Sequence, residues 1–278
     1  MKLIVIANEA PYPANHGGRV DVWHRICALK AAGAEIFLIF WSGDAPDELP
    51  AAQALARLRQ EVVDLSYYVI HRSVAERITR AWRLWRWPSH VASRVLARSD
   101  RKVLLEKVRV FRPDAVWLDG IYGGVLAAEL AETLAVPLFC RSHNIEHLYM
   151  SRQVAKAAYL RDRLAWGLNL LHLRSFELGT LRRAARFFDI SMDDVQFWRG
   201  LGLSNGAWLP PMMDPGSAAR LSAPWEEPPA FDVGYLGNLF APNNVEGVLW
   251  LLEEIVERLR VTRPGFLEGI QKVKAAQG

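Results

Sequence analysis

Short apolar runs that alternate with helical patterns constrain the fold of this chain more than any other feature. The run "KLIVIA" at 2–7 predicts a buried strand, residues 19–32 predict a helix, and "EIFLIF" at 35–40 predicts a second strand after the turn at Gly33. The alternation resumes in three further segments, 114–120, 121–134 and 136–140. This order is typical of an α/β fold with a doubly wound, mainly parallel, Rossmann-like sheet. Ligands of such sheets bind beyond the carboxyl ends of the strands.

The second half of the alternation is longer and more helical. Residues 152–186 predict one long helix, and the short runs "FFDIS" and "GAWLPP" predict two further strands. Within the predicted helix, the leucines are spaced so that they share one face, and these are Leu160, Leu164, Leu168 and Leu171.

A proline-rich stretch divides the chain. Residues 210–230 contain six prolines, which is typical of an extended linker between domains. We therefore expect a first domain over 1–209 and the beginning of a second domain over 231–278. That second part has one strand run, "FDVGYLG", and one helix over 243–260. Because a single strand and helix cannot bury their own apolar faces, we expect this part either to pack back on the first domain or to be the beginning of a second domain that has been cut short.

Residues 72–112 are strongly basic, with twelve Lys or Arg against three Asp or Glu, although the whole chain has a formal charge of only +4. Trp82, Trp85 and Trp87 alternate with arginines here, a composition typical of an interfacial helix beside anionic lipid. Nucleic-acid binding is a weaker alternative, and we expect no nucleic-acid partner. The remaining alternative is a solvated helical face whose tryptophans point into the core.

The ends and the cysteines indicate a compartment. Only five apolar residues follow Lys2 before Asn8, fewer than a signal peptide or a membrane span needs. Cys27 and Cys140 are far apart and form no C-x-x-C motif, which is consistent with a reducing environment. We expect a cytoplasmic protein that the basic segment could hold at the inner face of the membrane.

The segment "RSHNIEH" at 141–147 matches H-x-x-E-H, a pattern that binds zinc in one group of proteases. In those proteases the pattern lies within a helix, whereas here Pro137 and the run "LFC" place His143 at a strand-to-helix junction. The sequence offers no third ligand, so we expect no metal and treat His147 as a bystander. A zinc hydrolase would require stoichiometric bound metal.

Several segments, in order along the chain, resemble the retaining, nucleotide-sugar-dependent glycosyltransferases of the GT-B fold, family 4. The resemblance covers most of the chain through about Gly265. It rests on the segments "PYPANHGGRVDVWHRICALKAAGAEI", "RSHNIE", "FFDISMDDVQFWRGLG", "LPPMMD" and "VGYLGNLFAPNNVEGVLWLLEEIVERLRVTRPG".

The chain departs from the family pattern in its second domain. The family normally continues for well over a hundred further residues and carries paired glutamates that hold the donor, and no such continuation is present here. The loop "GNLFAPNNVEG", with Gly237 and Asn238 as candidate donor-phosphate residues, lacks the basic residue that many relatives have.

The resemblance implies a glycosyltransferase that transfers a sugar from a nucleotide sugar to a glycan or lipid-linked acceptor with retention, in cell-envelope polysaccharide or glycolipid biosynthesis. It implies no cofactor, because the nucleotide sugar is a substrate. The alternative is a catalytically inactive, truncated module that binds only an acceptor or a partner.

The resemblance also assigns candidate site residues. His143 is the candidate catalytic residue, with no nucleophilic role, because retaining transfer needs stabilisation of an oxocarbenium-like state. Gly17 and Gly18 precede a helix whose free amides suit a phosphate, although they could form a plain turn. Asp119 could bind sugar hydroxyls or cap a helix. The candidate substrate-binding residues are Gly17, Gly18, Arg19, Asp119, Tyr122, Asn144 and Glu146.

We interpret Glu177, three residues after Arg174, as part of a surface ion pair.

Overall fold

The computed structural model describes residues 1–157, 159–212, 235 and 242–263. The chain divides into two units, Met1–Met213 and Asp214–Gly278. The predicted strand "FDVGYLG" lies outside the described residues except for Tyr235, and so do the candidate donor residues Gly237 and Asn238.

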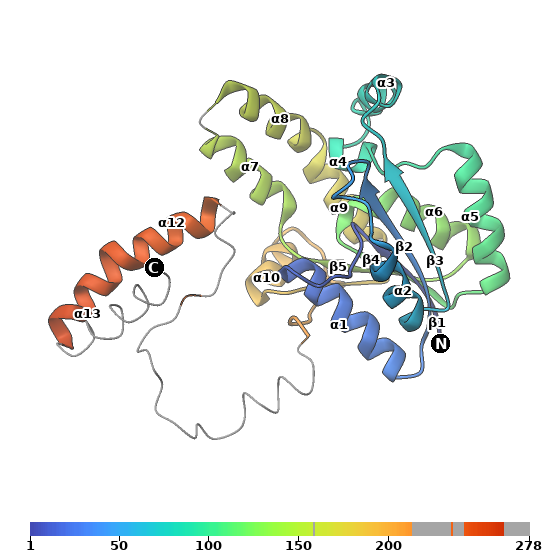
Figure 1. Cartoon of the computed structure of the whole chain (residues 1–278), viewed down its shortest axis with the longest axis horizontal. Coiled ribbons are helices and arrows are strands. Elements are labelled where there is room, and N and C mark those ends of the chain that lie inside the picture. The colour runs from blue at the N-terminus through green and yellow to red at the C-terminus, as the bar shows by residue number, and fades with distance from the viewer. Residues whose placement is uncertain (158, 213–234, 236–241, 264–278) are drawn as a thin grey trace. The chain divides into compact units, whose positions relative to one another are not determined.

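The first unit is built on a seven-stranded, all-parallel sheet with the strand order β3-β2-β1-β4-β5-β6-β7 (Figure 1). The order reverses direction at β1, which is the doubly wound arrangement that the sequence predicts. The strands are β1 (Lys2–Ala7), β2 (Glu35–Gly43), β3 (Asp64–Ile70), β4 (Ala115–Asp119), β5 (Leu138–Ser142), β6 (Arg186–Asp189) and β7 (Gly206–Trp208).

Helices cover both faces of this sheet (Figure 1). Alternate residues of β1 face opposite sides, so Leu3 and Val5 pack with one cluster and Ile4 and Ile6 with the other. Helices α1 (Gly17–Ala31) and α2 (Ala52–Glu61) complete the first cluster. The second cluster draws on α5 (Arg98–Phe111), α6 (Gly124–Leu134), α7 (Glu146–Lys156), α9 (Leu173–Arg183) and α10 (Met192–Gly200).

The predicted long helix over 152–186 is wrong, because α7, α8 (Leu160–Leu170) and α9 replace it. Ala157 has an extended backbone and ends α7, and His172, with φ of 59°, lies in the left-handed region between α8 and α9. The leucine face that the sequence predicts lies on α8 and the residue after it, but it is exposed: Leu160 is 73% exposed and Leu164 62%.

The basic segment begins with α3 (Val74–Arg83), which has no buried residue and stands away from the sheet (Figure 1). A short helix, α4 (Ser89–Ala92), follows and packs against α3. Trp82 is 77% exposed and Trp85 80% exposed, so the interpretation that places these tryptophans in the core is wrong.

The described part of the second unit is helical. Helix α12 (Pro242–Trp250), a π-helical turn η2 (Leu251–Val256) and α13 (Glu257–Thr262) follow one another without a break. This confirms the helix predicted over 243–260. Among the described residues of the whole chain, no helix combines the length and the apolar character that crossing a bilayer requires.

Candidate functional site

The residues that follow β1, β4 and β5 meet at the carboxyl edge of the sheet. The loop after β1 runs from Asn8 to His16, includes a cis peptide bond between Tyr12 and Pro13, and leads into α1. A small cavity of about 60 Å³ lies between this loop, the amino end of α1 and the ends of β4 and β5. It is lined by Ala7, Asn8, Glu9, Pro11, Gly18, Arg19, Val22, Asp119 and His143.

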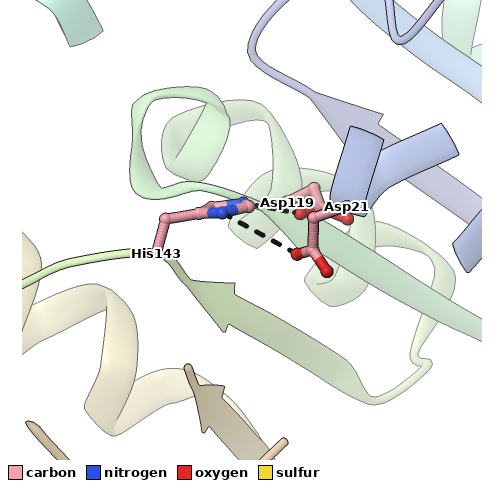
Figure 2. A group of neighbouring side chains, drawn as sticks. All are labelled: Asp21, Asp119 and His143. Carbon is pink, nitrogen blue, oxygen red and sulfur yellow. Dashed lines mark hydrogen bonds and ion pairs between the residues drawn. The ribbon is translucent and has the colours of Figure 1, made fainter. Parts of the chain in front are cut away.

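The last residue of β4 and the first residue after β5 contact each other. His143 Nε2 lies 2.8 Å from Asp119 Oδ1 (Figure 2). Since an ionised carboxylate only accepts hydrogen bonds, Nε2 carries the ring hydrogen and donates a hydrogen bond to Asp119. His143 Nδ1 is 3.9 Å from Asp21 Oδ2, too far for a hydrogen bond, so this nitrogen has no hydrogen bond to a described residue. The His143 side chain is 19% exposed, which leaves the ring within reach of a ligand.

A buried network of charges holds Asp119 in place. Arg25 donates to Asp119 Oδ2 and to Asp21 Oδ2, and Trp117 Nε1 donates to Asp119 Oδ2 over 3.1 Å. Arg141 Nε donates to Asp21 Oδ2 over 3.2 Å, and its Nη1 donates to the carbonyl of Leu209. Because two guanidinium groups face two carboxylates, the network is electrically balanced before His143 is counted.

The charges also set the protonation state of Asp119. Burial alone would raise the pKa of Asp119, but the charge of Arg25 and the hydrogen bond from His143 outweigh it and hold that pKa below its usual range. Asp119 is 1% exposed, and both of its oxygens already accept hydrogen bonds. The geometry therefore fits Asp119 to orient His143 rather than to contact a substrate directly.

Asp21, Asp119 and His143 are also the one group of described residues whose ligand atoms lie close enough to hold a metal ion, within 4.8 Å of one another (Figure 2). The guanidinium of Arg25 already bridges the two carboxylates, so a cation would have to displace it. The three residues of the H-x-x-E-H pattern do not share a centre. His143 contacts Asp119, Glu146 contacts Tyr122, and His147 contacts Glu177.

The amino end of α1 is open. Its capping residue, His16, makes no side-chain hydrogen bond to the helix, and the first turn contains no acidic residue. A Cβ atom added at Gly17 would meet nothing within 4 Å, and one at Gly18 would meet only the His16 ring at 3.7 Å. Arg19 lies beside these amides, and its Nε donates to Glu9 Oε2 over 2.9 Å. Neither glycine is required by packing, so their space is available to a ligand.

Gly120, directly after β4, has a structural role. Its φ is +77°, and a Cβ atom there would lie 2.2 Å from Asn8 Nδ2. Only glycine fits this position without displacing Asn8. The turn therefore fixes the loop after β1 against the end of β4.

The remaining candidate residues lie in a second, adjoining group. Tyr122, in the short helix η1 (Ile121–Gly123), donates from its hydroxyl to Glu146 Oε2 over 2.7 Å. Burial raises the pKa of Glu146, and the charge of Glu177 acts in the same direction. Asn144 is exposed, and its carbonyl accepts a hydrogen bond from Ser142. Tyr122 and Glu146 are thus paired with each other rather than with His143.

The interpretation of Glu177 as part of a surface ion pair is wrong, because its side chain is fully buried. It accepts hydrogen bonds from the backbone amides of Glu146 and His147 and from the His147 ring. It therefore satisfies free donors at the start of α7, where a carboxylate is favoured.

Three residues of the site were missed by the sequence analysis: Asp21, Arg25 and Arg141. One signal was present, because Arg141 directly follows the apolar run "LFC" at the end of a predicted buried strand, and a charge in such a position needs a buried partner. Asp21 and Arg25 are four residues apart on a helix, a spacing that is equally common on exposed faces.

No model of a known protein family matches the chain. The chain is 28% identical, over 266 residues, to an uncharacterized 44.6 kDa protein in the cps region of Klebsiella pneumoniae. The match covers 91% of this chain and 60% of that protein, so the chain spans less than two thirds of this relative.

The chain spans about half of the length of the solved structures that it resembles. Sucrose-phosphate synthase from Thermosynechococcus elongatus has a TM-score of 0.47 and 14% identity, over 82% of this chain and 54% of that one. Anabaena HepE in complex with UDP has a TM-score of 0.44 and 9% identity, over 80% and 49%. Arabidopsis thaliana UGT89C1 complexed with UDP-L-rhamnose has a TM-score of 0.41 and 12% identity, over 81% and 55%. Because these TM-scores are below 0.5, the α/β assignment rests on the strand order and register of the chain itself.

Proposed function

We propose that this chain contains the acceptor-side domain of a GT-B glycosyltransferase of family 4, which transfers a sugar from a nucleotide sugar to a glycan or lipid-linked acceptor with retention. The observation that carries the proposal is the meeting of His143 and Asp119, from adjacent strand ends, with the open amino end of α1 around one cavity. The segments "RSHNIE" and "PYPANHGGRV", on which the family resemblance rests, supply two of these three parts.

Each part has a chemical role in this proposal. The free amides and the positive end of the α1 dipole suit the negative charge of the leaving diphosphate. Gly17 and Gly18 allow its oxygens to approach the backbone. His143 Nδ1 accepts a hydrogen bond from a hydroxyl of the transferred sugar or of the acceptor, while Asp119 and Arg25 hold the ring in the tautomer that leaves Nδ1 free. No metal is needed for these roles.

We also propose that α3 holds the protein at an anionic membrane surface, which places it on the cytoplasmic face. Val74, Ile78 and Trp82 are spaced four residues apart along α3, and Trp85 lies in the turn after it, so the four form one stripe. All four side chains are exposed, and basic residues flank them. Amphipathic helices with this composition lie in the headgroup region of bilayers.

The experiment that tests the enzymatic proposal incubates the purified chain with a panel of radiolabelled nucleotide sugars and a bacterial membrane-lipid extract. We expect labelled lipid or glycan to form. Binding of an acceptor without any turnover would instead identify a module that lacks catalysis. Loss of folding on metal removal would favour a metal-dependent hydrolase.

A further inference from the structure

A second, larger cavity of about 560 Å³ lies beneath α3 and shares no lining residue with the cavity that contains His143. Its volume falls within the range of about 300–1,000 Å³ that is typical of small-molecule sites. The ends of β2 and β3, one side of α3 and the start of α5 contribute its walls. Because β3 is the first strand in the sheet order, the cavity borders the free edge of the sheet.

Two tyrosines of β3 supply aromatic surface to this cavity. Tyr67 stacks on Phe40, with ring centroids 5.5 Å apart and planes 10° apart, and it is 37% exposed. Tyr68 packs against Trp41, and its hydroxyl makes no hydrogen bond to a described residue. Burial and the charge of Asp100 raise the pKa of Tyr68 to about 12, so the hydroxyl keeps its hydrogen and is available as a donor.

The charged side chains of the cavity include donors and acceptors that are both unused. Arg77 makes no hydrogen bond or ion pair to any residue that the structure describes. The same holds for the carboxylates of Glu76 and Asp100, which also line the cavity. Arg72, a further lining residue, is already paired with Asp44 and Glu48 on its other side. The cavity therefore presents unpaired groups of both signs.

Two further arginines of this wall are fixed in position. Arg80 Nε and Nη2 donate to Ser89 Oγ over 3.1 and 2.5 Å, and Arg83 Nη1 donates to the carbonyls of Ala92 and Val95 over 3.1 and 3.0 Å. Arg80 Nη1 and Arg83 Nη2 have no partner among the described residues. These contacts hold the guanidinium groups against the chain on either side of α4, so their remaining N–H groups are positioned before a ligand arrives.

Helix α3 separates these polar groups from its apolar stripe. Arg77, Arg80 and Arg83 are three residues apart and therefore lie on one side of the helix, together with Glu76. The exposed apolar stripe of α3 lies on the opposite side. A contact of that stripe with a membrane would therefore leave the cavity beneath the helix open to a ligand.

The balance of charges indicates the class of ligand. Three unpaired arginines, Arg77, Arg80 and Arg83, face two unpaired carboxylates, those of Glu76 and Asp100, so an anion would be attracted by the first group and repelled by the second. A hydroxyl group both donates and accepts hydrogen bonds, and so it can use both kinds of partner. A sugar ring has several such hydroxyls, and its C–H groups can pack on an aromatic face such as that of Tyr67.

We propose that the cavity beneath α3 binds a neutral sugar residue of a glycan, through Tyr67, Tyr68 and the unpaired charged groups of α3 and α5. Ser93 lines this cavity, and the adjacent Arg94 donates from Nη2 to the carbonyl of Asn8 over 3.2 Å. Asn8 in turn lines the cavity of His143, so the segment 93–94 lies between the two spaces.

The inference rests on the proposed function in one respect, which is that the bound sugar belongs to the acceptor. The sugar beneath α3 is then a different residue from the one that receives the transferred sugar near His143. The acceptor is therefore a glycan of at least two sugar residues, whether or not a lipid carries it.

The test measures binding to the full chain by ligand-observed NMR. The probes are the methyl glycosides of glucose, galactose and mannose, followed by saturation transfer, and inorganic phosphate, followed by phosphorus line broadening. Tyr68→Phe, which removes only an unpartnered hydroxyl, and Asp100→Ala should each raise the dissociation constant of a bound glycoside about fivefold, because each removes one hydrogen bond. Tyr149→Phe and Glu106→Ala, at exposed positions of α7 and α5, are the matched controls and should bind as the wild type does.

Circular dichroism checks that each variant is folded, and Tyr68→Phe should fold because the hydroxyl has no described partner to lose. No saturation transfer from any glycoside, or unchanged affinity in both cavity variants, would overturn the site. Binding of phosphate in preference to every glycoside, with loss in Arg77→Ala, would identify an anion site and overturn the assignment to a neutral sugar. The assay uses no donor, so glycoside binding that persists in a chain without sugar transfer would count against the proposed function alone.

Discussion

His143 donates a hydrogen bond to Asp119 although 24 positions separate the two residues, because β4 and β5 are adjacent and parallel. Asp119→Asn removes the charge that pairs with Arg25 and should lower the free energy of unfolding by about 3 kcal/mol, the usual cost of stranding a buried partner. Urea unfolding at pH 7 measures this. Asp47→Asn, at an exposed position, should change it by less than about 0.5 kcal/mol.

The low pKa of Asp119 also predicts that the stability of the fold decreases in acid. Because the pKa of Asp119 is lower in the folded than in the unfolded state, its contribution to stability is present above the unfolded value and is lost as the pH falls toward the folded one. Asp119→Asn should therefore flatten the acid limb of the stability profile. An acid limb identical to that of the wild type would contradict the ionised state assigned to Asp119.

Asp189, at the end of β6, should give the stability of the fold the opposite dependence on pH. It is fully buried, and burial raises its pKa to about 7. The folded state therefore holds a proton that the unfolded chain loses near pH 4, so stability should fall as the pH rises from about 4 to about 7. Asp189→Asn should remove this slope, with a gain over the wild type of at most about 4 kcal/mol at pH 8. Unfolding curves at pH 5 and pH 8 measure the difference, and a wild type equally stable at both would contradict the raised pKa.

Substitution of Gly18 should affect ligand binding, whereas substitution of Gly120 should affect the stability of the fold. Gly18→Asp places a carboxylate at the amino end of α1, where it should leave stability unchanged or raise it by about 0.5 kcal/mol, yet repel a diphosphate. We expect nucleotide-sugar binding to weaken about tenfold without a fall in melting temperature. Gly120→Ala should instead destabilise the fold by more than about 1 kcal/mol, because of its positive φ and the contact with Asn8. Undiminished binding by Gly18→Asp would exclude this helix end as the phosphate site.

Trp82 and Trp85 should carry the membrane contact of α3. The double variant Trp82→Ala, Trp85→Ala should lose most of its co-sedimentation with vesicles that contain anionic lipid, because it removes two exposed interfacial anchors. Trp208→Ala, at another exposed tryptophan, is the matched control and should sediment as the wild type does. Equal sedimentation of the double variant and the control would show that α3 does not bind lipid. Trp87 is omitted from the variant because it is only partly exposed.

The sequence was informative about the sheet because apolar runs must be buried on both faces of a parallel sheet. The rule that ligands lie beyond strand carboxyl ends then placed Asp119 and His143 at one edge, and their contact confirms that placement. The roles of these residues, and those of Gly17, Gly18, Arg19, Tyr122, Asn144 and Glu146, stay predictions.

The parts that the sequence could not supply depend on long-range pairing. Glu177 resembles half of a local ion pair with Arg174, and only the fold reveals that it reaches the start of α7. Arg25 and Asp21 pair locally, but their link to Asp119 and Arg141 depends on where α1 packs. The leucine spacing predicts a shared face on one long helix, but α8 ends at Leu170 and these leucines are exposed, because spacing alone does not indicate where a helix ends or whether its face is covered.

The most direct test of the central claim compares the wild type with His143→Ala in sugar transfer from radiolabelled nucleotide sugars to a membrane-lipid extract. Glu106→Gln, at an exposed residue of α5, is the control. We predict transfer by the wild type and by the control, and a loss of about a hundredfold or more in His143→Ala, which should stay folded at the assay temperature although it loses the hydrogen bond to Asp119. Transfer by His143→Ala at the wild-type rate, or no transfer from any donor by the wild type, would contradict the account.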